Sequence, residues 1–326
     1  MQGKEASEQE TKVKCSVGID VSKSWLDIHI LPGNERLRVA NTYADIRRLK
    51  RWLGRFDIAL VAIEATGKWH RHVQRSLVAS NIPTAVVDPF RVRMFAKAQG
   101  ILAKTDRLDA RVLALFAALM DPATRAPASQ IMAELAELIA ARNRAVEAQT
   151  VLKNQLSTSE GSFLKSQLKR RLLRAGKDIA ELDDEILRCI RTDDTLARRY
   201  AVLTSIPSVG FAVAATLLAC LAEIGSASAK QIAMLAGLAP IADQSGQRDG
   251  VRVVWGGRPA VRRILYLAAL SAIRFNADMK AFYQRLRASG KAPKVGLIAV
   301  ARKLVVLANT LINEDRLWQP RALKYA

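Results

Sequence analysis

Cysteine is scarce in this chain of 326 residues, which contains only three. Cys15, Cys189 and Cys220 stand far apart, with neither Cys-x-x-Cys spacing nor histidine partners, so a disulfide framework and a zinc site are both excluded. We expect all three to be ordinary buried thiols. Histidine is equally rare, and the three histidines, His29, His70 and His72, are too scattered to be assigned a function. His70 and His72 follow Glu64 closely, and for these two we expect a solvated helix face.

Long hydrophobic runs are also missing. No stretch approaches the roughly 18–20 uninterrupted apolar residues of a membrane span, and the first dozen residues are polar rather than a signal peptide. We therefore expect a protein of the cytoplasm or the nucleoid, with no membrane partner. Half of the residues are hydrophobic, which excludes overall disorder and predicts two or three folded domains.

Acidic residues are too few to balance the basic ones. Lys plus Arg number 51 against 30 Asp plus Glu, a formal net charge of +21. Such a field attracts polyanions and predicts salt-dependent binding to nucleic acid. A polybasic protein of the membrane surface is the alternative that charge alone leaves open.

The few acids include four in conspicuous contexts. They lie in Val17-Gly-Ile-Asp20, in Ile63-Glu64-Ala-Thr-Gly67 and in Lys104-Thr-Asp106-Arg-Leu-Asp109. Carboxylates are the ligands that Mg²⁺ prefers, and phosphodiester chemistry uses such ions on the entering and leaving oxygens. The four together therefore indicate a Mg²⁺ site. The alternative for Asp106 and Asp109 is an acidic first helical turn that suits the helix dipole.

The region from residue 12 to about residue 120 alternates strand-like and helical patterns. Three short strands predicted at 17–21, 25–30 and 37–40 are followed by a helix around Leu49, a strand at 58–63, a helix at 69–79, a strand at 84–87 and a helix from Asp106. This order is expected of an α/β domain of the RNase H type. It places Asp20 in the middle of the first strand and Glu64 at the carboxyl end of the fourth, where open sheets bind ligands.

Residues from about 130 to 198 are rich in helix formers and charge. Leucine and isoleucine recur at coiled-coil-like spacing in two predicted helices, separated by Ser157-Thr-Ser-Glu-Gly161. A spacer that joins protomers is our preferred interpretation, and an intramolecular helical arm is the alternative.

The remainder predicts a mainly helical domain that contacts phosphates. Ile206-Pro-Ser-Val-Gly210 resembles the turn of a helix-hairpin-helix, whose backbone amides accept a phosphate without reading a base; a plain helix corner is the alternative. From Gln247 to the end the chain holds 16 Lys plus Arg against 4 Asp plus Glu. That surplus beside glycine-rich sequence suits a loop pressed against phosphates.

These motifs, with Ala236-Gly-Leu-Ala-Pro240 and Ser245-Gly246, resemble in their order the insertion-sequence transposases of the one-ten family and the related Piv/MooV DNA invertases. The resemblance covers nearly the whole chain after residue 12. It departs from the family at Ser208, where a glycine or another small residue is usual, and at Asp249 and Trp255, in a segment expected to be more uniformly basic.

The resemblance implies four regions: a polar tail at 1–12, a RuvC-like (RNase H fold) DEDD catalytic domain at 13–128, a coiled-coil arm at 129–199 and a transposase domain at 200–326. It implies that Asp20, Glu64, Asp106 and Asp109 bind Mg²⁺, or Mn²⁺ as a substitute, and that Ser245 is a catalytic serine. Without the resemblance, Ser245 reads as an ordinary turn serine.

The implied activity is cutting and rejoining of DNA through a phosphoserine link. The implied partners are donor and target DNA, a structured noncoding guide (bridge) RNA and further copies of the chain in a dimer or tetramer, in a bacterial or archaeal host. The nucleic-acid contacts that we predict are Lys104, Pro207, Val209, Gly210, Gly246, Arg248, Arg252, Arg258, Arg262 and Arg263. Two alternatives stay open: a RuvC-type structure-specific endonuclease without serine chemistry, and a non-catalytic nucleic-acid-binding scaffold.

Overall fold

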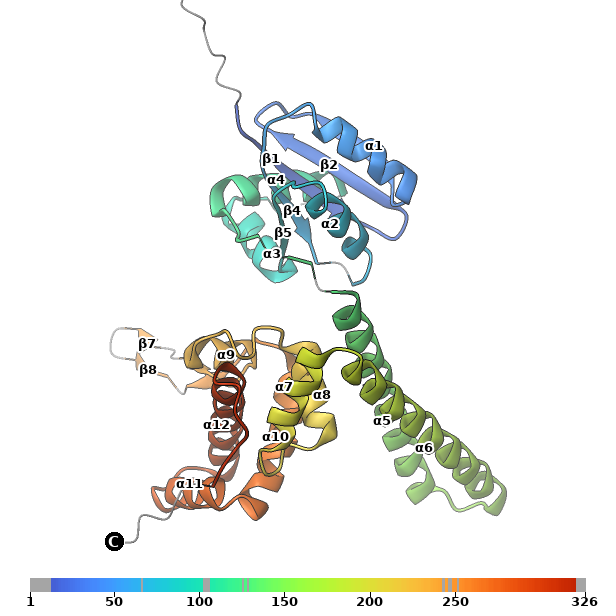
Figure 1. Ribbon diagram of the computed structural model, residues 1–326, viewed down its shortest axis with the longest axis vertical. Coiled ribbons are helices and arrows are strands. Elements are labelled where there is room, and N and C mark those ends of the chain that lie inside the picture. The colour runs from blue at the N-terminus through green and yellow to red at the C-terminus, as the bar shows by residue number, and fades with distance from the viewer. Residues whose placement is uncertain are drawn as a thin grey trace, which may run out of the picture. The chain divides into compact units, whose positions relative to one another are not determined.

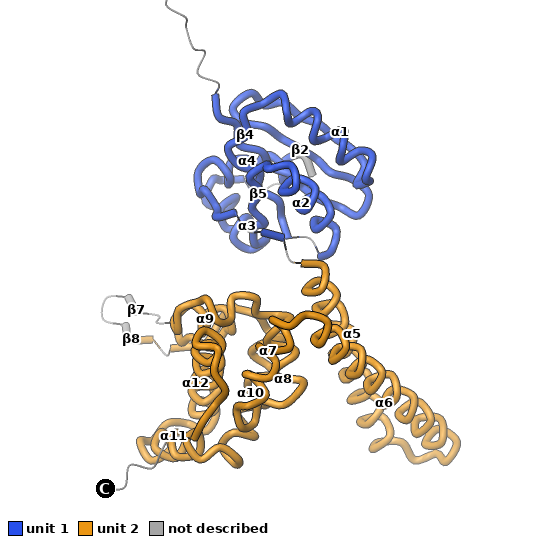
Figure 2. The backbone as a smooth tube through the Cα atoms, in the orientation of Figure 1, with its two compact units in different colours: residues 1–128 blue, residues 129–326 orange. Residues whose placement is uncertain are grey.

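The structure is a computed structural model that describes residues 13–65, 67–101, 106–124, 126–127, 129–241, 244–245, 248–250 and 252–320, with only the backbone described at 106–107, 244–245 and 248–249. The chain divides into two compact units, Met1–Ala128 and Ser129–Ala326 (Figure 2). Lys104, Gly246 and the polar tail at 1–12 lie outside the described residues.

The first unit is built on a mixed five-stranded sheet with strand order β3-β2-β1-β4-β5. The first three strands form an antiparallel meander, whereas β4 runs parallel to β1 and β5 parallel to β4. The strands are β1 (Cys15–Val21), β2 (Trp25–Leu31), β3 (Arg36–Ala40), β4 (Ile58–Glu64) and β5 (Thr84–Val87). Each strand predicted from the sequence is confirmed to within two residues at its ends.

Helices cover both faces of this sheet (Figure 1). Apolar residues alternate along β1, so that Val17 and Ile19 pack with two helices on one face, while the opposite face packs against the other two. The helices of the first face are α1 (Tyr43–Leu53) and α2 (His70–Val78); those of the second are α3 (Pro89–Ala98) and α4 (Asp106–Met120).

Helix α3 is absent from the sequence prediction. Its start nevertheless carries a recognisable signal, because Asp88 caps the helix by accepting a hydrogen bond from the backbone N–H of Arg91 at 3.1 Å and Pro89 occupies the first helical position. The helix buries little beyond Val92 and shows a weak apolar periodicity. This short apolar face explains why the pattern was missed.

Gly18 of β1 is the point where α4 crosses the sheet. A Cβ atom at this position would lie 2.0 Å from the carbonyl oxygen of Ala110 and 2.3 Å from the backbone nitrogen of Ala114. Only glycine allows a helix backbone to approach a strand this closely. The Val-Gly-Ile-Asp motif therefore sets the distance between Asp20 and the helix that carries Asp109.

Replacing Gly18 by alanine is expected to lower the free energy of unfolding by about 3 kcal/mol, because α4 must move away from a well-packed core. Gly54 offers a matched control in the same unit, since its φ is −61° and an added Cβ would meet its nearest atom at an ordinary 3.5 Å. Denaturant unfolding of Gly18→Ala and Gly54→Ala measures the difference. Equal stability of the two variants would contradict the close approach.

The second unit begins with a pair of long antiparallel helices, α5 (Gln130–Thr158) and α6 (Ser162–Arg191), which pack against each other as an arm (Figure 1). Leu152 and Leu168 are buried in the arm, and Arg142 of α5 forms an ion pair with Asp183 of α6. Within the chain, the structure therefore confirms the intramolecular arm. Joining of protomers by this arm stays a prediction.

The rest of the second unit is a helical body around one apolar core, to which the base of the arm contributes Leu135 and Ile139. Its helices are α7 (Asp194–Thr204), α8 (Phe211–Cys220), α9 (Ala229–Leu235), α10 (Pro259–Phe275), α11 (Ala277–Ala288) and α12 (Pro293–Asn313). By length and composition, α12 is apolar enough to cross a membrane, but more than half of its most apolar stretch is buried in this core. Its hydrophobicity thus has a structural explanation.

A turn joins α7 and α8 where the sequence predicted a helix-hairpin-helix-like turn or a plain helix corner, and it shows strain at Ser208. This residue has φ of +79°, in the left-handed region that favours glycine, and its buried hydroxyl has no hydrogen-bond partner among the described residues. Ile206 and Val209 on either side are buried in the core, and the Val209 N–H donates to the carbonyl of Ile206 at 2.9 Å.

Replacing Ser208 by glycine is expected to raise the free energy of unfolding by about 1 kcal/mol, because relief of the left-handed strain and of the unpaired hydroxyl outweighs the added flexibility of glycine. Ser208→Ala keeps the strain and removes only the hydroxyl, so it should stabilise less. Thermal unfolding of both variants checks this order. A glycine variant less stable than wild type would contradict it.

Candidate active site and nucleic-acid interface

Asp20 and Glu64 lie on the same face of the sheet, at the carboxyl ends of neighbouring strands. Gly18 pairs with Ala62 and Ile19 with Ile63 in the parallel ladder between β1 and β4, and each acid follows one residue after the last of these pairs. Neighbouring strands are about 4.8 Å apart, so both half-buried acids lie close together. The sequence predicted Asp20 in the middle of the first strand; in the structure it lies one residue from the end of β1.

Asp109 of α4 reaches the same region. It lines a cavity of about 330 Å³ together with Glu64, while Arg93 and Lys97 of α3 line the same cavity and are exposed. Carboxylates for a cation and basic groups for a phosphate therefore share one opening. This is the arrangement that chemistry on a phosphodiester requires.

Asp106 begins α4 one helical turn before Asp109, and nothing is described of its side chain. Among the side chains that the structure describes, no three His, Cys, Asp or Glu residues form a cluster that could hold a metal ion. Asp20, Glu64 and Asp109 nevertheless supply the hard oxygen donors that Mg²⁺ prefers. The donor chemistry fits a divalent cation, and Asp106 is the further carboxylate that the sequence places beside them.

A buried carboxylate next to this site was not predicted. Asp27 of β2 lies directly opposite Asp20 in the antiparallel ladder, is only 8% exposed and has Nε of Arg38 at 3.7 Å from its carboxylate. Arg38 therefore balances a second acid beside Asp20. The sequence signal was the alternation of polar and apolar residues in Trp25-Leu-Asp-Ile-His, which puts Asp27 and His29 on one face.

His29, two residues further along β2, is almost fully buried, and neither ring nitrogen has a hydrogen-bond partner among the described residues. Burial is the main cause that lowers the pKa of its imidazole, with the positive charge of Arg36 adding to it. Burial thus favours the neutral form of the ring. We expected His72 on a solvated helix face. Instead its ring packs against that of Tyr43, with ring centroids 3.8 Å apart.

The cysteines behave largely as predicted. All three are free thiols; Cys15 and Cys189 are buried, whereas Cys220 is only half-buried. Burial raises the pKa of each thiol, which disfavours the reactive thiolate.

Ser245 lies in a small hairpin of the second unit that has two successive two-stranded ladders. The ladder at its base pairs β6 (Pro240–Ile241) with β9 (Val253–Val254), and the outer ladder pairs β7 (Gln244–Ser245) with β8 (Arg248–Asp249). Ser245 is opposite Arg248 in the outer ladder. The side chains of both residues lie outside the described part of the structure, so their proposed roles stay predictions.

Two glycine motifs hold the base of this hairpin. Gly257 has φ of +65°, and a Cβ atom there would lie 2.2 Å from the backbone nitrogen of Gly237, which itself has φ of +66°. Arg262 donates from Nη1 to the carbonyl of Gly256 at 2.7 Å. The glycines that the sequence placed around Ser245 therefore allow two backbones to touch and fix where the hairpin starts.

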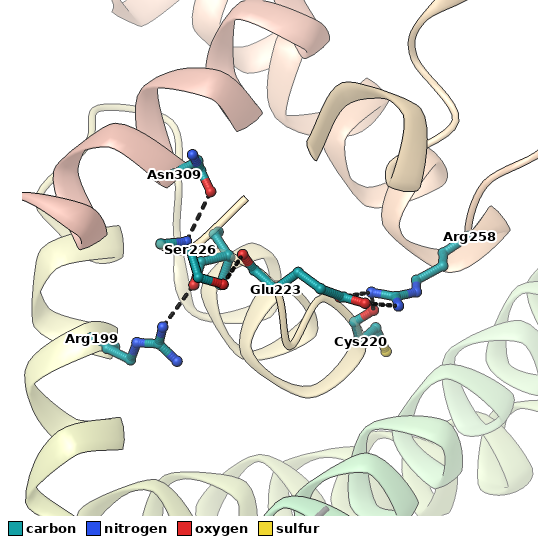
Figure 3. Close-up of polar contacts among 8 residues, drawn as sticks. Arg199, Cys220, Glu223, Ser226, Arg258 and Asn309 are labelled. Atoms are coloured by element: carbon teal, nitrogen blue, oxygen red, sulfur yellow. Dashed lines mark hydrogen bonds and ion pairs between the residues drawn. The ribbon is translucent and has the colours of Figure 1, made fainter. Parts of the chain in front are cut away.

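Arg258, predicted to contact nucleic acid, is half-buried and paired within the protein (Figure 3). Its guanidinium donates to both carboxylate oxygens of Glu223, at 2.6 and 2.8 Å, and to the carbonyl of Cys220 at 3.0 Å. Asn309 of α12 fixes the same loop by accepting from the N–H of Gly225 at 2.8 Å. Any phosphate contact by Arg258 would compete with these hydrogen bonds.

The other predicted contacts differ in their surroundings. Arg263 of α10 is paired with Glu147 of α5, whereas Arg252 is exposed just before β9. In the α7–α8 turn, Pro207 is half-buried and Gly210 is exposed at the start of α8. The amide of Val209 is already used within the turn, which leaves the following helix start as the part suited to a phosphate.

Two family models match this chain. One, described as a transposase and belonging to the DEDD type of IS110 elements, matches residues 17–159, which include all four acids. The other, described as the transposase IS116/IS110/IS902 family, matches residues 200–284, which include the α7–α8 turn and the Ser245 hairpin. The chain belongs to the IS110 transposase family. This transposase therefore has the α/β sheet domain and the mainly helical region of that family.

Curated relatives agree. A pilin gene-inverting protein of Moraxella bovis is 27% identical over 319 residues, 94% of this chain and 98% of the relative, and that of Moraxella lacunata matches to the same extent. A 43.6 kDa protein of the insertion element IS110 of Streptomyces coelicolor is 30% identical over 122 residues, 37% of this chain and 30% of the relative. The transposase is thus a DNA-cleaving and rejoining enzyme, and its DEDD domain indicates dependence on a divalent metal.

Proposed function

We propose that this transposase recombines DNA by forming a transient phosphoserine link through Ser245, next to a Mg²⁺ centre made by Asp20, Glu64, Asp106 and Asp109. The observation that carries the proposal is the shared cavity of Glu64 and Asp109, with Asp20 on the strand beside Glu64. The strand order β3-β2-β1-β4-β5 supports a RuvC-like fold for this domain.

The chemistry is a transesterification. The Ser245 hydroxyl oxygen bonds to phosphorus, the bond from phosphorus to one sugar oxygen breaks, and the serine proton passes to solvent or a nearby base. A divalent cation on the four carboxylates, Mg²⁺ or Mn²⁺, would neutralise charge on the phosphate oxygens. Arg93 and Lys97 would hold the phosphate at the mouth of the cavity. Because the energy of the phosphodiester is kept in the serine ester, the strand can be rejoined.

Ser245 and the four acids lie in different compact units. We infer that they meet in an assembly of two or four copies, in which Ser245 of one copy serves the acids of another. The substrates in this proposal are donor and target DNA, selected by a structured guide RNA, in the nucleoid of a bacterial or archaeal cell. The net charge of +21 supports binding to both nucleic acids.

The Moraxella relatives favour rejoining over cutting alone, since their name describes a gene that is inverted and therefore resealed. The experiment that tests the proposal incubates purified transposase with the RNA from its element, Mg²⁺ and labelled donor and target DNA. The proposal expects joined strands that disappear when EDTA removes the metal. Free ends alone would identify a structure-specific endonuclease, and binding without any cutting would identify a scaffold.

A further inference from the structure

The helical body carries a second basic feature, a hollow of about 840 Å³ between α9, β6 and the last two helices. We refer to it as the α9–α12 groove. Four basic side chains line it and, among the side chains that the structure describes, no acid does, unlike at the carboxylate site; they are Lys230, Arg252, Arg302 and Lys303. Arg252 was predicted as a nucleic-acid contact from the sequence. Lys230 precedes it by 22 residues, Arg302 and Lys303 follow it by 50 and 51, and only the fold brings the four together.

The floor of this groove is apolar. It includes Met234 at 55% exposed and Ile241 at 45% exposed. Val306 of α12 and Phe282 of α11 complete the wall. An apolar floor inside a basic rim suits a ligand with an apolar face and negative charge on the same molecule.

Phe282 also contacts one cation of the rim and a further arginine of its own helix. The ammonium of Lys303 lies 4.4 Å from the centroid of its ring and the guanidinium of Arg285 lies 5.4 Å from it. Phe282 and Lys303 line a second cavity of about 540 Å³, to which Arg285 and Arg316 contribute. The two hollows therefore adjoin at α11 and α12, and an acid, Asp278, also lines the second.

We propose that the α9–α12 groove binds an unpaired nucleic-acid strand, with its bases on the apolar floor and its phosphates on the basic rim. A duplex hides the apolar faces of its bases and presents only phosphates, so it would leave Met234 and Ile241 in contact with water. A single strand matches both surfaces. Strand β6 lines the groove and pairs with β9 at the base of the Ser245 hairpin, so a strand held here would lie next to that base.

This inference rests on the proposed function only in taking nucleic acid as the class of partner. It needs no strand cleavage and no metal, so it is tested by binding alone and its failure can be told apart from failure of the serine chemistry. The probes are a fluorescent 12-nucleotide thymidine strand, a strand of equal length without bases, a uridine RNA strand and a DNA duplex. Each is titrated with the full chain in EDTA at several salt concentrations.

Lys230→Gln with Arg252→Gln is expected to weaken binding of the thymidine strand roughly tenfold and to reduce the salt slope by about 1.4, because each lost phosphate contact removes about 0.7. Both side chains are exposed, so the fold should be unaffected. Lys169→Gln with Arg170→Gln is the matched control, since this exposed pair lies on α6, away from the groove residues in sequence and structure. A double variant that binds like this control would overturn the proposal.

Met234→Ser tests the floor. It is expected to weaken binding of the thymidine strand about fivefold while leaving the strand without bases unchanged, because only bases contact the floor. Comparable loss for both strands, or equal loss for the duplex, would overturn a site for unpaired bases. Preference for the uridine strand would assign the groove to guide RNA and preference for the thymidine strand to displaced DNA, and either supports the groove as a single-strand site.

Discussion

Glu64→Gln and Asp109→Asn are each expected to slow strand cleavage by about 10²- to 10³-fold without weakening the binding of DNA. Both residues line the same cavity, and each substitution keeps the shape of the side chain while removing the negative charge that a divalent cation requires. The rate of nicking of a labelled DNA site in Mg²⁺ measures the loss, and fluorescence anisotropy measures the affinity.

Asp57→Asn is the matched control for these substitutions. Asp57 is an exposed acid that directly precedes β4, the strand that carries Glu64 at its other end. The Asp57→Asn substitution removes one negative charge from the same unit, so a purely electrostatic effect on DNA binding would appear in this variant as well. Nicking by Glu64→Gln at the wild-type rate would show that the cavity does not house the chemistry.

Ser245→Ala is expected to abolish strand exchange, by at least about 10³-fold, and to leave nucleic-acid binding intact. An alanine cannot form the bond to phosphorus, and no activating group can replace a missing nucleophile. Yields of joined strands from paired donor and target DNA measure the effect. Ser166→Ala, on the exposed face of α6, is the control for loss of a serine hydroxyl and should recombine normally. Full strand exchange by Ser245→Ala would rule out the serine as nucleophile.

Much of the first unit was predictable because its signals are local. A strand-like pattern predicted β1 and a continuous apolar run predicted β4, and the ends of these strands fixed where Asp20 and Glu64 lie. The arm was predictable for the same reason, since leucines at helical spacing continue through two long segments with a polar break between them.

The remaining features depend on contacts between distant segments. Asp27 looks like any polar residue of a half-exposed strand until the ladder places it opposite Asp20 and Arg38. Arg258 belonged to a basic run that read as a phosphate contact, yet its partner Glu223 is 35 residues away. The backbone contact between Gly237 and Gly257 likewise needs the fold, because the sequence shows only that each glycine permits an unusual turn.

The most direct test of the account is a search for the covalent link itself. The transposase is incubated with its RNA, Mg²⁺ and DNA labelled at the scissile site, quenched in denaturant and separated on a denaturing gel with and without protease, followed by mass spectrometry of the labelled peptide. The account predicts a protease-sensitive adduct whose nucleotide is attached to the peptide that contains Ser245 and which is absent in Ser245→Ala. Strand breaks that need Mg²⁺, carry no peptide and persist in Ser245→Ala would contradict it.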